Sequence, residues 1–145
     1  MLGGLLRAIL ARSLFMWGSL HRNFGNNASF AREHHSAVKR FSQAYRLDPA
    51  FREARLARAI LYYRELNMAE AGLADLDALL LEDPDYGPAL LNRAMAAQQL
   101  GRYAQALADL ERYLGLPAED DEYAQIAART AAALRDIVAE LPADV

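Results

Sequence analysis

The 145-residue chain has no cysteine, so it can form neither a disulfide nor a thiolate metal site. Proline and glycine are sparse, at five and eight residues, and alanine and leucine dominate. This composition favours helix throughout. Apolar residues make up 54% of the chain, which is enough for a hydrophobic core and argues against disorder.

A long uninterrupted hydrophobic run is also missing. The most apolar stretch, residues 2–20, contains Arg7 and Arg12, and no small-residue cleavage site is evident after it. A transmembrane helix needs about 20 consecutive, mostly apolar residues, and a secretory leader needs such a cleavage site. We therefore expect neither feature in this stretch, and we expect a cytoplasmic protein or, as the alternative, a peripheral membrane protein.

Charge is divided unevenly between the two halves of the chain. Residues 1–65 carry eleven Arg and Lys against four Asp and Glu, whereas residues 66–145 carry five Arg against fifteen Asp and Glu. A chain with this asymmetry can meet an anionic surface with its first half, or associate with itself head to tail. An elongated protein can equally tolerate uneven solvated charge, so both interpretations stay open.

A sequence repeat runs through the middle of the chain, where residues 54–82 align with residues 89–116. The recurring pairs are Ala54 and Ala89, Leu56 and Leu91, Arg58 and Arg93, Ala59 and Ala94, Leu66 and Leu100, Leu73 and Leu107, Ala74 and Ala108, Asp75 and Asp109, and Leu76 and Leu110. A period of 34 or 35 helix-forming residues is typical of stacked helical hairpins.

Hydrophobic period, capping residues and helix breakers predict seven helices and no strand. The predicted ranges are about 3–23, 28–47, 50–65, 69–82, 87–100, 103–114 and 120–140. Gly25, Asn67 and Gly101 are predicted to end the first helix of each pair, because glycine and asparagine tolerate the left-handed backbone found at helix ends. Small residues at Ala59 and Gly72 are predicted to let neighbouring helices approach closely.

The segment LGRYAQALADLERYLGLP, from Leu100 to Pro117, resembles the second half of a tetratricopeptide repeat. The matching features are the turn glycine Gly101, the aromatic Tyr103, the small Ala106 and the closing Pro117. Two earlier units resemble the same motif more loosely, through Asn67, Met68, Gly72, Ala78 and Pro84, and through Gly25, Ala37, Ala44 and Pro49.

This resemblance implies an all-α, right-handed α-solenoid of three helix pairs with a C-terminal capping helix. The whole chain, 1–145, would be a single domain of this type. Its parts would be a divergent repeat 1 (1–49), repeat 2 (50–84), repeat 3 (85–118) and a capping helix (119–141).

The resemblance also implies a noncatalytic scaffold or adaptor that binds a peptide or helix of a partner protein in a concave groove. The expected groove residues are Leu56, Ile60, Tyr63, Arg64, Leu91, Asn92, Met95, Gln98 and Gln99. The apolar members could instead pack only between repeats. Some members of this family grip a partner's C-terminal carboxylates, and Arg22 and Asn26 resemble part of such a clamp, but Ala57 and Pro88 stand where polar or basic groups would be needed.

The N-terminal helix has two interpretations. In the first it opens repeat 1, with Leu5, Leu6, Ile9, Leu10, Leu14 and Trp17 partly buried on the next helices. In the second, residues 2–17 form a basic amphipathic segment that contacts a membrane surface or a partner, and the alternative function is then that of a membrane-surface assembly factor. Phe15, Met16 and Trp17 are the residues expected to be exposed for such a contact.

Little in the sequence indicates chemistry. His34 and His35 are adjacent beside Glu33, and neighbours on a helix point about 100° apart, which does not suit a shared metal. Asp75, Asp77, Asp109 and Glu111 recur at the same repeat positions, which suggests a solvated or an inter-repeat structural role for these carboxylates and argues against acid–base chemistry. We expect no catalytic residue, no metal, no cofactor and no nucleic-acid partner.

Overall fold

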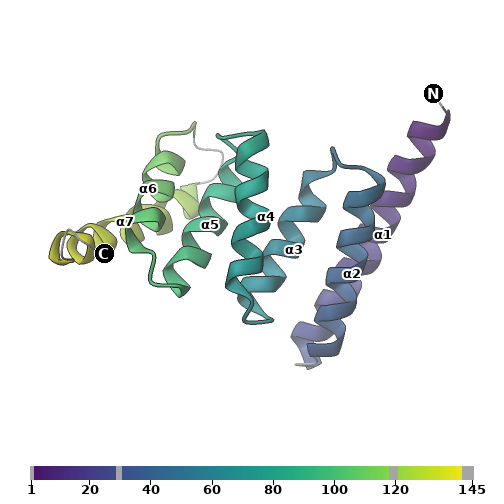
Figure 1. The fold of residues 1–145 in the computed structure, drawn as a ribbon, viewed down its shortest axis with the longest axis horizontal. Coiled ribbons are helices and arrows are strands. Elements are labelled where there is room, and N and C mark those ends of the chain that lie inside the picture. Colours follow the sequence, from purple (N-terminus) through teal and green to yellow (C-terminus); the bar gives the residue numbers. More distant parts are fainter. Residues whose placement is uncertain (1, 29–30, 118–120, 142–145) are drawn as a thin grey trace. The chain divides into compact units, whose positions relative to one another are not determined.

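The computed structural model describes residues 2–28, 31–117 and 121–141, and all seven regular elements there are α-helices. The helices are α1 (Leu2–Ala28), α2 (Ala31–Leu47), α3 (Arg52–Arg64), α4 (Ala69–Glu82), α5 (Gly87–Gln99), α6 (Tyr103–Leu114) and α7 (Asp121–Glu140) (Figure 1). The predicted all-α class is confirmed. The predicted boundary between residues 118 and 119 lies outside the described residues.

Two compact units divide the chain, Met1–Asp75 and Leu76–Val145, and their boundary falls within α4. Helix ends agree well with the sequence pattern from α3 onward, and the predicted ranges 69–82 and 103–114 coincide with α4 and α6. Asn67 and Gly101 have positive φ angles of 53° and 71°, as predicted for the turns that follow α3 and α5.

The predicted end of the first helix at Gly25 is wrong. Helix α1 continues without interruption to Ala28, and Gly25 is buried within it. A β-carbon at this position would collide with the imidazole ring of His34 on α2. Gly25 is therefore a residue of close helix contact, and not a turn residue like Gly101.

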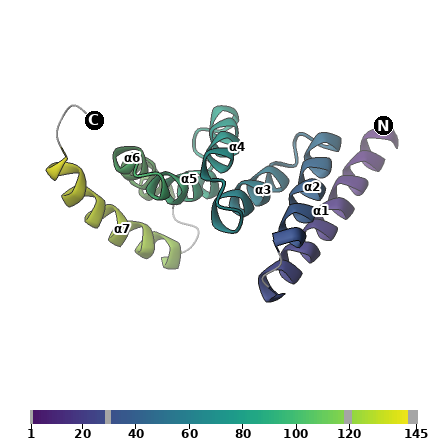
Figure 2. The same ribbon diagram turned by 60° about the horizontal axis from the view of Figure 1, so that its bottom comes forward.

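Helices α1 and α2 lie side by side and antiparallel (Figure 2). The side of α1 that is buried carries small residues at intervals of seven, namely Ala11, Gly18 and Gly25. Residues seven apart lie on nearly the same face of a helix, and small side chains there let two helix axes approach closely. A β-carbon on Gly18 would lie only 2.6 Å from Cε1 of Phe41, which is fully buried on α2.

This arrangement corrects the predicted orientation of α1. Leu5, Leu6, Ile9, Leu10 and Trp17, which were expected to be partly buried, are all exposed. Only Leu14 of that set is half-buried. The reason is steric, because the small-residue side of α1 permits a closer contact with α2 than the bulky side would.

Phe15 also differs from the expectation of exposure. It is half-buried, and its ring centroid lies 5.2 Å from that of Phe41 and 5.0 Å from that of Phe51. These separations are typical of favourable aromatic pairs. Phe15 therefore joins α1 to α2 and to the residue that precedes α3.

Short side chains also bring α3 and α4 together. Ala59 is fully buried, and a β-carbon on Gly72 would lie 3.0 Å from its carbonyl oxygen. The predicted close approach at this pair is confirmed.

The second unit is built in the same way, from alanines and leucines. Helix α6 contacts both α5 and α7. The buried residues of these three helices include Leu90, Ala94, Ala106, Leu110, Ala127, Ala131 and Leu134. Both small and large apolar side chains are therefore buried where these helices pack.

We predict that Gly18→Ala lowers the free energy of unfolding by about 1–3 kcal/mol, because the added methyl group must displace the buried Phe41 ring. Urea denaturation measures the change. Gly4→Ala is the matched control in the same helix, since a β-carbon there meets nothing within 4 Å. The control should leave stability unchanged or raise it by up to about 1 kcal/mol. Equal behaviour of the two variants would contradict the close contact of α1 and α2.

Candidate functional site

The repeated arginine and aspartate residues of the sequence form ion pairs between helices. In the first unit, Arg58 on α3 donates from Nε to Oδ2 of Asp75 at 2.7 Å and from Nη2 to Oδ1 at 2.5 Å. Its remaining nitrogen, Nη1, donates to the hydroxyl of Ser42 on α2 at 2.8 Å. One guanidinium thus links three successive helices within this unit.

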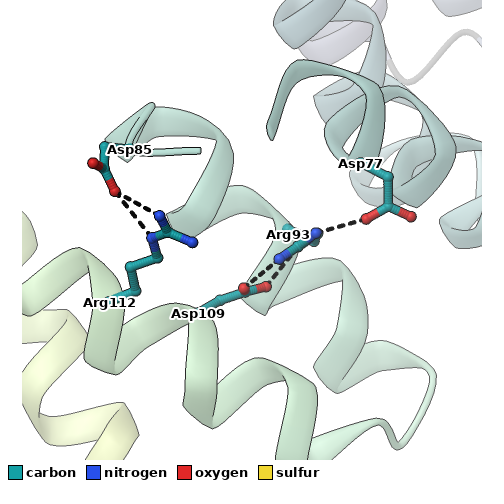
Figure 3. A network of polar contacts seen from close by, with 5 residues as sticks. All are labelled: Asp77, Asp85, Arg93, Asp109 and Arg112. Atoms are coloured by element: carbon teal, nitrogen blue, oxygen red, sulfur yellow. Dashed lines mark hydrogen bonds and ion pairs between the residues drawn. The ribbon is translucent and has the colours of Figure 1, made fainter. Parts of the chain in front are cut away.

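Arg93 occupies the equivalent position in the second unit (Figure 3). It donates from Nε and Nη2 to the carboxylate of Asp109 on α6, at 2.8 and 2.6 Å, and from Nη1 to Asp77 on α4 at 2.8 Å. Asp109 is only 4% exposed, whereas Asp77 is exposed. Bidentate pairing of this kind is the strongest form of arginine–carboxylate contact.

These contacts raise the pKa of the two arginines. The hydrogen bonds with Asp109 raise the pKa of Arg93 above its ordinary value, although burial acts in the opposite direction and Asp77 adds a smaller increase. Asp75 raises the pKa of Arg58 in the same way. Both arginines are bound to carboxylates, so Asp75 and Asp109 each join two helices.

Glu111 completes the series of repeated carboxylates. It accepts a hydrogen bond from Nε of Arg135 on α7 at 3.0 Å. Ser42, Asp77 and Glu111 therefore occupy corresponding positions on α2, α4 and α6, and each contacts an arginine of the helix that follows. The recurrence of the arginines and carboxylates is evident in the sequence, but their pairing is not.

The predicted groove residues of α3 differ widely in exposure. Leu56 and Ile60 are half-buried, and Arg64 is exposed. Tyr63 is only 3% exposed, and its β-carbon lies 3.3 Å from the position that a β-carbon on Gly72 would take. The accessible part of this face is therefore Leu56, Ile60 and Arg64, with Tyr63 turned toward α4.

The predicted residues of α5 form a more polar face. Leu91 is buried, Asn92, Met95 and Gln98 are half-buried, and Gln99 is exposed. Nδ2 of Asn92 donates to the carbonyl of Pro88 at 2.7 Å, which fixes the orientation of its amide. Met95 thus lies among amide groups on the accessible side of α5.

The histidines are engaged in pairwise contacts. Nδ1 of His21 lies 2.7 Å from Oε2 of Glu33, and Nε2 of the buried His34 lies 2.9 Å from Oδ1 of Asn26. His35 is exposed. Among the residues that the structure describes, no group of three or more histidine and acidic side chains is placed to hold a metal ion.

The predicted contact residues of α1 are divided between two environments. Met16 and Trp17 are 71% and 58% exposed, whereas Phe15 belongs to the interior. Within the described ranges, none of the helices combines the length and the apolar character that a membrane span requires.

No family model matches the chain, and no curated protein matches it. Several solved structures, however, are similar to this chain. The Arabidopsis OM64 TPR domain is 23% identical, with a TM-score of 0.71 over 90% of this chain and 98% of that one. The first TPR domain of Spaghetti (RPAP3), bound to the HSP90 peptide SRMEEVD, is 21% identical, with a TM-score of 0.72 over 88% of this chain and 95% of that one.

A third similar structure is the Yersinia enterocolitica type III secretion chaperone SycD in complex with a peptide of the translocator YopD. It is 18% identical, with a TM-score of 0.69 over 89% of this chain and 95% of that one. The chain therefore has the all-α helical-repeat fold of tetratricopeptide repeat domains, as the Leu100 to Pro117 segment predicted.

We predict that Arg93→Met lowers the free energy of unfolding by about 3–5 kcal/mol, because it leaves the buried Asp109 carboxylate without its cation. Arg112→Met is the matched control, since Arg112 pairs with Asp85 at 2.9 Å and their side chains are 50% and 64% exposed (Figure 3). The control should cost less than about 1 kcal/mol. Similar losses in urea denaturation would show that the Arg93 contact contributes no more than a surface ion pair.

A further prediction concerns the free energy of unfolding at alkaline pH. Burial raises the pKa of the Tyr63 phenol, and the charge of Arg64 offsets this in part. A group whose pKa is higher in the folded state stabilises the fold at low pH and loses that contribution as pH rises, here above about pH 10. Tyr63→Phe should therefore show a smaller loss of unfolding free energy above about pH 10 than the unchanged chain. Tyr123→Phe, at an exposed tyrosine, should keep the original pH dependence.

Proposed function

We propose that this chain is a noncatalytic protein-interaction module that binds a peptide or helix of a partner on the first helices of its repeats. Two proteins of the same fold, Spaghetti and SycD, are seen with bound peptides, which supports this class of function. The pairing of the repeated carboxylates with arginines supports it as well, because these acidic groups are engaged in holding helices together.

The α5 face supplies the observation on which the proposal mainly depends. Met95 offers a flexible, polarizable side chain that adapts to varied apolar partners. Asn92, Gln98 and Gln99 surround it with amide groups that can both donate and accept hydrogen bonds. An apolar anchor among amides suits a peptide that buries one hydrophobic side chain and hydrogen-bonds through its backbone.

The α3 face offers a different chemistry. Leu56 and Ile60 are half-buried apolar side chains, and the exposed Arg64 follows them one turn later. This combination suits an amphipathic segment that carries a hydrophobic residue and an acidic residue about one turn apart. Tyr63 and Leu91 are buried, so in this proposal they support the two faces and do not contact the peptide directly.

We further propose that the ligand is an internal segment and not a free C-terminal tail. Ala57 is buried, and Pro88 has no side-chain donor, so neither can bind a terminal carboxylate. Asn26, one of the two residues that resemble a carboxylate clamp, is hydrogen-bonded to His34.

The test is a selection of peptides from a displayed random library, followed by fluorescence anisotropy with the selected peptides. Met95→Glu and Ile60→Glu should each weaken binding by about tenfold or more, because each places a charge where an apolar side chain of the peptide would be buried. Ile137→Glu, on an exposed position of α7, is the matched control and should bind as the unchanged chain does. Circular dichroism verifies that all variants are folded.

Three outcomes would contradict the proposal. The library could yield no binding peptide, or binding could be indifferent to both Met95→Glu and Ile60→Glu. Tight binding of the acidic peptide SRMEEVD, lost on removal of its terminal carboxylate, would overturn the proposal of an internal ligand.

A further inference from the structure

Helix α1 exposes a row of large apolar side chains along one face. Its exposed members are Leu5, Leu6, Ile9, Leu10, Met16, Trp17, Leu20 and Phe24. With 3.6 residues per turn they fall within an arc of about 140° of the helix circumference, and they extend over about 28 Å of its length. An exposed apolar surface of this extent usually marks a contact with another protein or with a membrane.

The row faces away from the protein interior. The opposite side of α1 is the small-residue side with Ala11, Gly18 and Gly25, which packs against α2. Figure 2 shows α1 at the edge of the first unit, with α2 on one side. The helix thus has its bulky residues outside and its small residues inside, which is the reverse of an ordinary surface helix.

The charge on helix α1 itself is of one sign. Helix α1 contains Arg7, Arg12 and Arg22 and no acidic residue. Residues 2–47, which cover α1 and α2, contain seven Arg and Lys against one acidic residue, Glu33. Glu33 is paired with His21, and Asp48, just after α2, lies 3.6 Å from Arg12.

We propose that this row docks on an anionic lipid surface, with α1 lying in the plane of the membrane interface. An amphipathic helix with Trp, Phe and Leu on one face and cations beside them is the usual form of such an element. Tryptophan and phenylalanine favour the boundary between headgroups and acyl chains, which Trp17 and Phe24 would reach. The proposal is independent of the peptide-binding faces of α3 and α5.

Charge complementarity favours an anionic lipid surface over a second copy of the chain as the partner of this row. Two copies joined through the row would bring Arg7 and Arg12 of each copy together, with no acidic residue on either α1 to neutralise them. Anionic headgroups supply the missing negative charge. Each arginine held near such a surface strengthens binding by about fivefold.

Trp17 is the only tryptophan of the chain and reports on the contact directly. Its fluorescence should shift to shorter wavelength when the full chain is mixed with vesicles of phosphatidylcholine and phosphatidylserine. Vesicles of phosphatidylcholine alone should give weaker binding, and added salt should weaken binding to the mixed vesicles. Absence of a shift with either kind of vesicle would overturn the proposal, as would equal binding to both.

Point substitutions on α1 test whether this helix makes the contact with the vesicles. Leu6→Glu and Leu10→Glu should each lower the vesicle partition coefficient by about tenfold or more, because each removes a leucine from the lipid. Leu81→Glu is the matched control, since Leu81 is 86% exposed on α4, and it should partition as the unchanged chain does. Equal losses in all three variants would overturn the assignment to α1. A lipid-free dimer in sedimentation equilibrium, abolished by Leu10→Glu but not by Leu81→Glu, would assign the row to a second copy instead.

Discussion

A buried arginine–aspartate pair, repeated once in each unit, is the interaction that fixes how the helices of each hairpin meet. Removing a carboxylate such as Asp109 from water is costly, and only a well-aligned cation offsets the cost. Arg93 provides two parallel hydrogen bonds to it and a third to Asp77, so three of its five donors join α5 to α6 and to α4. We infer that the pair specifies which helix faces which, a task that interchangeable contacts between leucines and alanines perform poorly.

Helix α1 follows a different rule from the helices after it. In α5 and α6 both leucines and alanines are among the buried residues. In α1 the buried residues are Ala11, Gly18 and Gly25, whereas most of the large apolar residues are exposed and only Leu14 and Phe15 are half-buried. The two helices therefore present chemically distinct surfaces, a mixed amide and apolar face on α5 and an apolar face on the cationic helix α1.

Much of the fold was predictable because local rules and tertiary packing agree from α3 onward. Asn67 and Gly101 adopt the left-handed backbone that their residue types favour, and the helices between them begin and end where the pattern places them. Gly25 was misassigned because a glycine at a helix end and a glycine at a helix crossing look the same in a sequence. Only the His34 ring packed against it distinguishes the two.

The sequence by itself determined the helical class, the repeat and the recurrence of Arg58 with Arg93 and of Asp75 with Asp109, because these follow from residue type and spacing. The tertiary structure decided which charges pair, since Arg58 and Asp75 are seventeen residues apart and meet only when α4 folds back on α3. It also decided which apolar residues are exposed. Tyr63 is buried and Trp17 is not, because burial depends on the neighbour that each helix face receives.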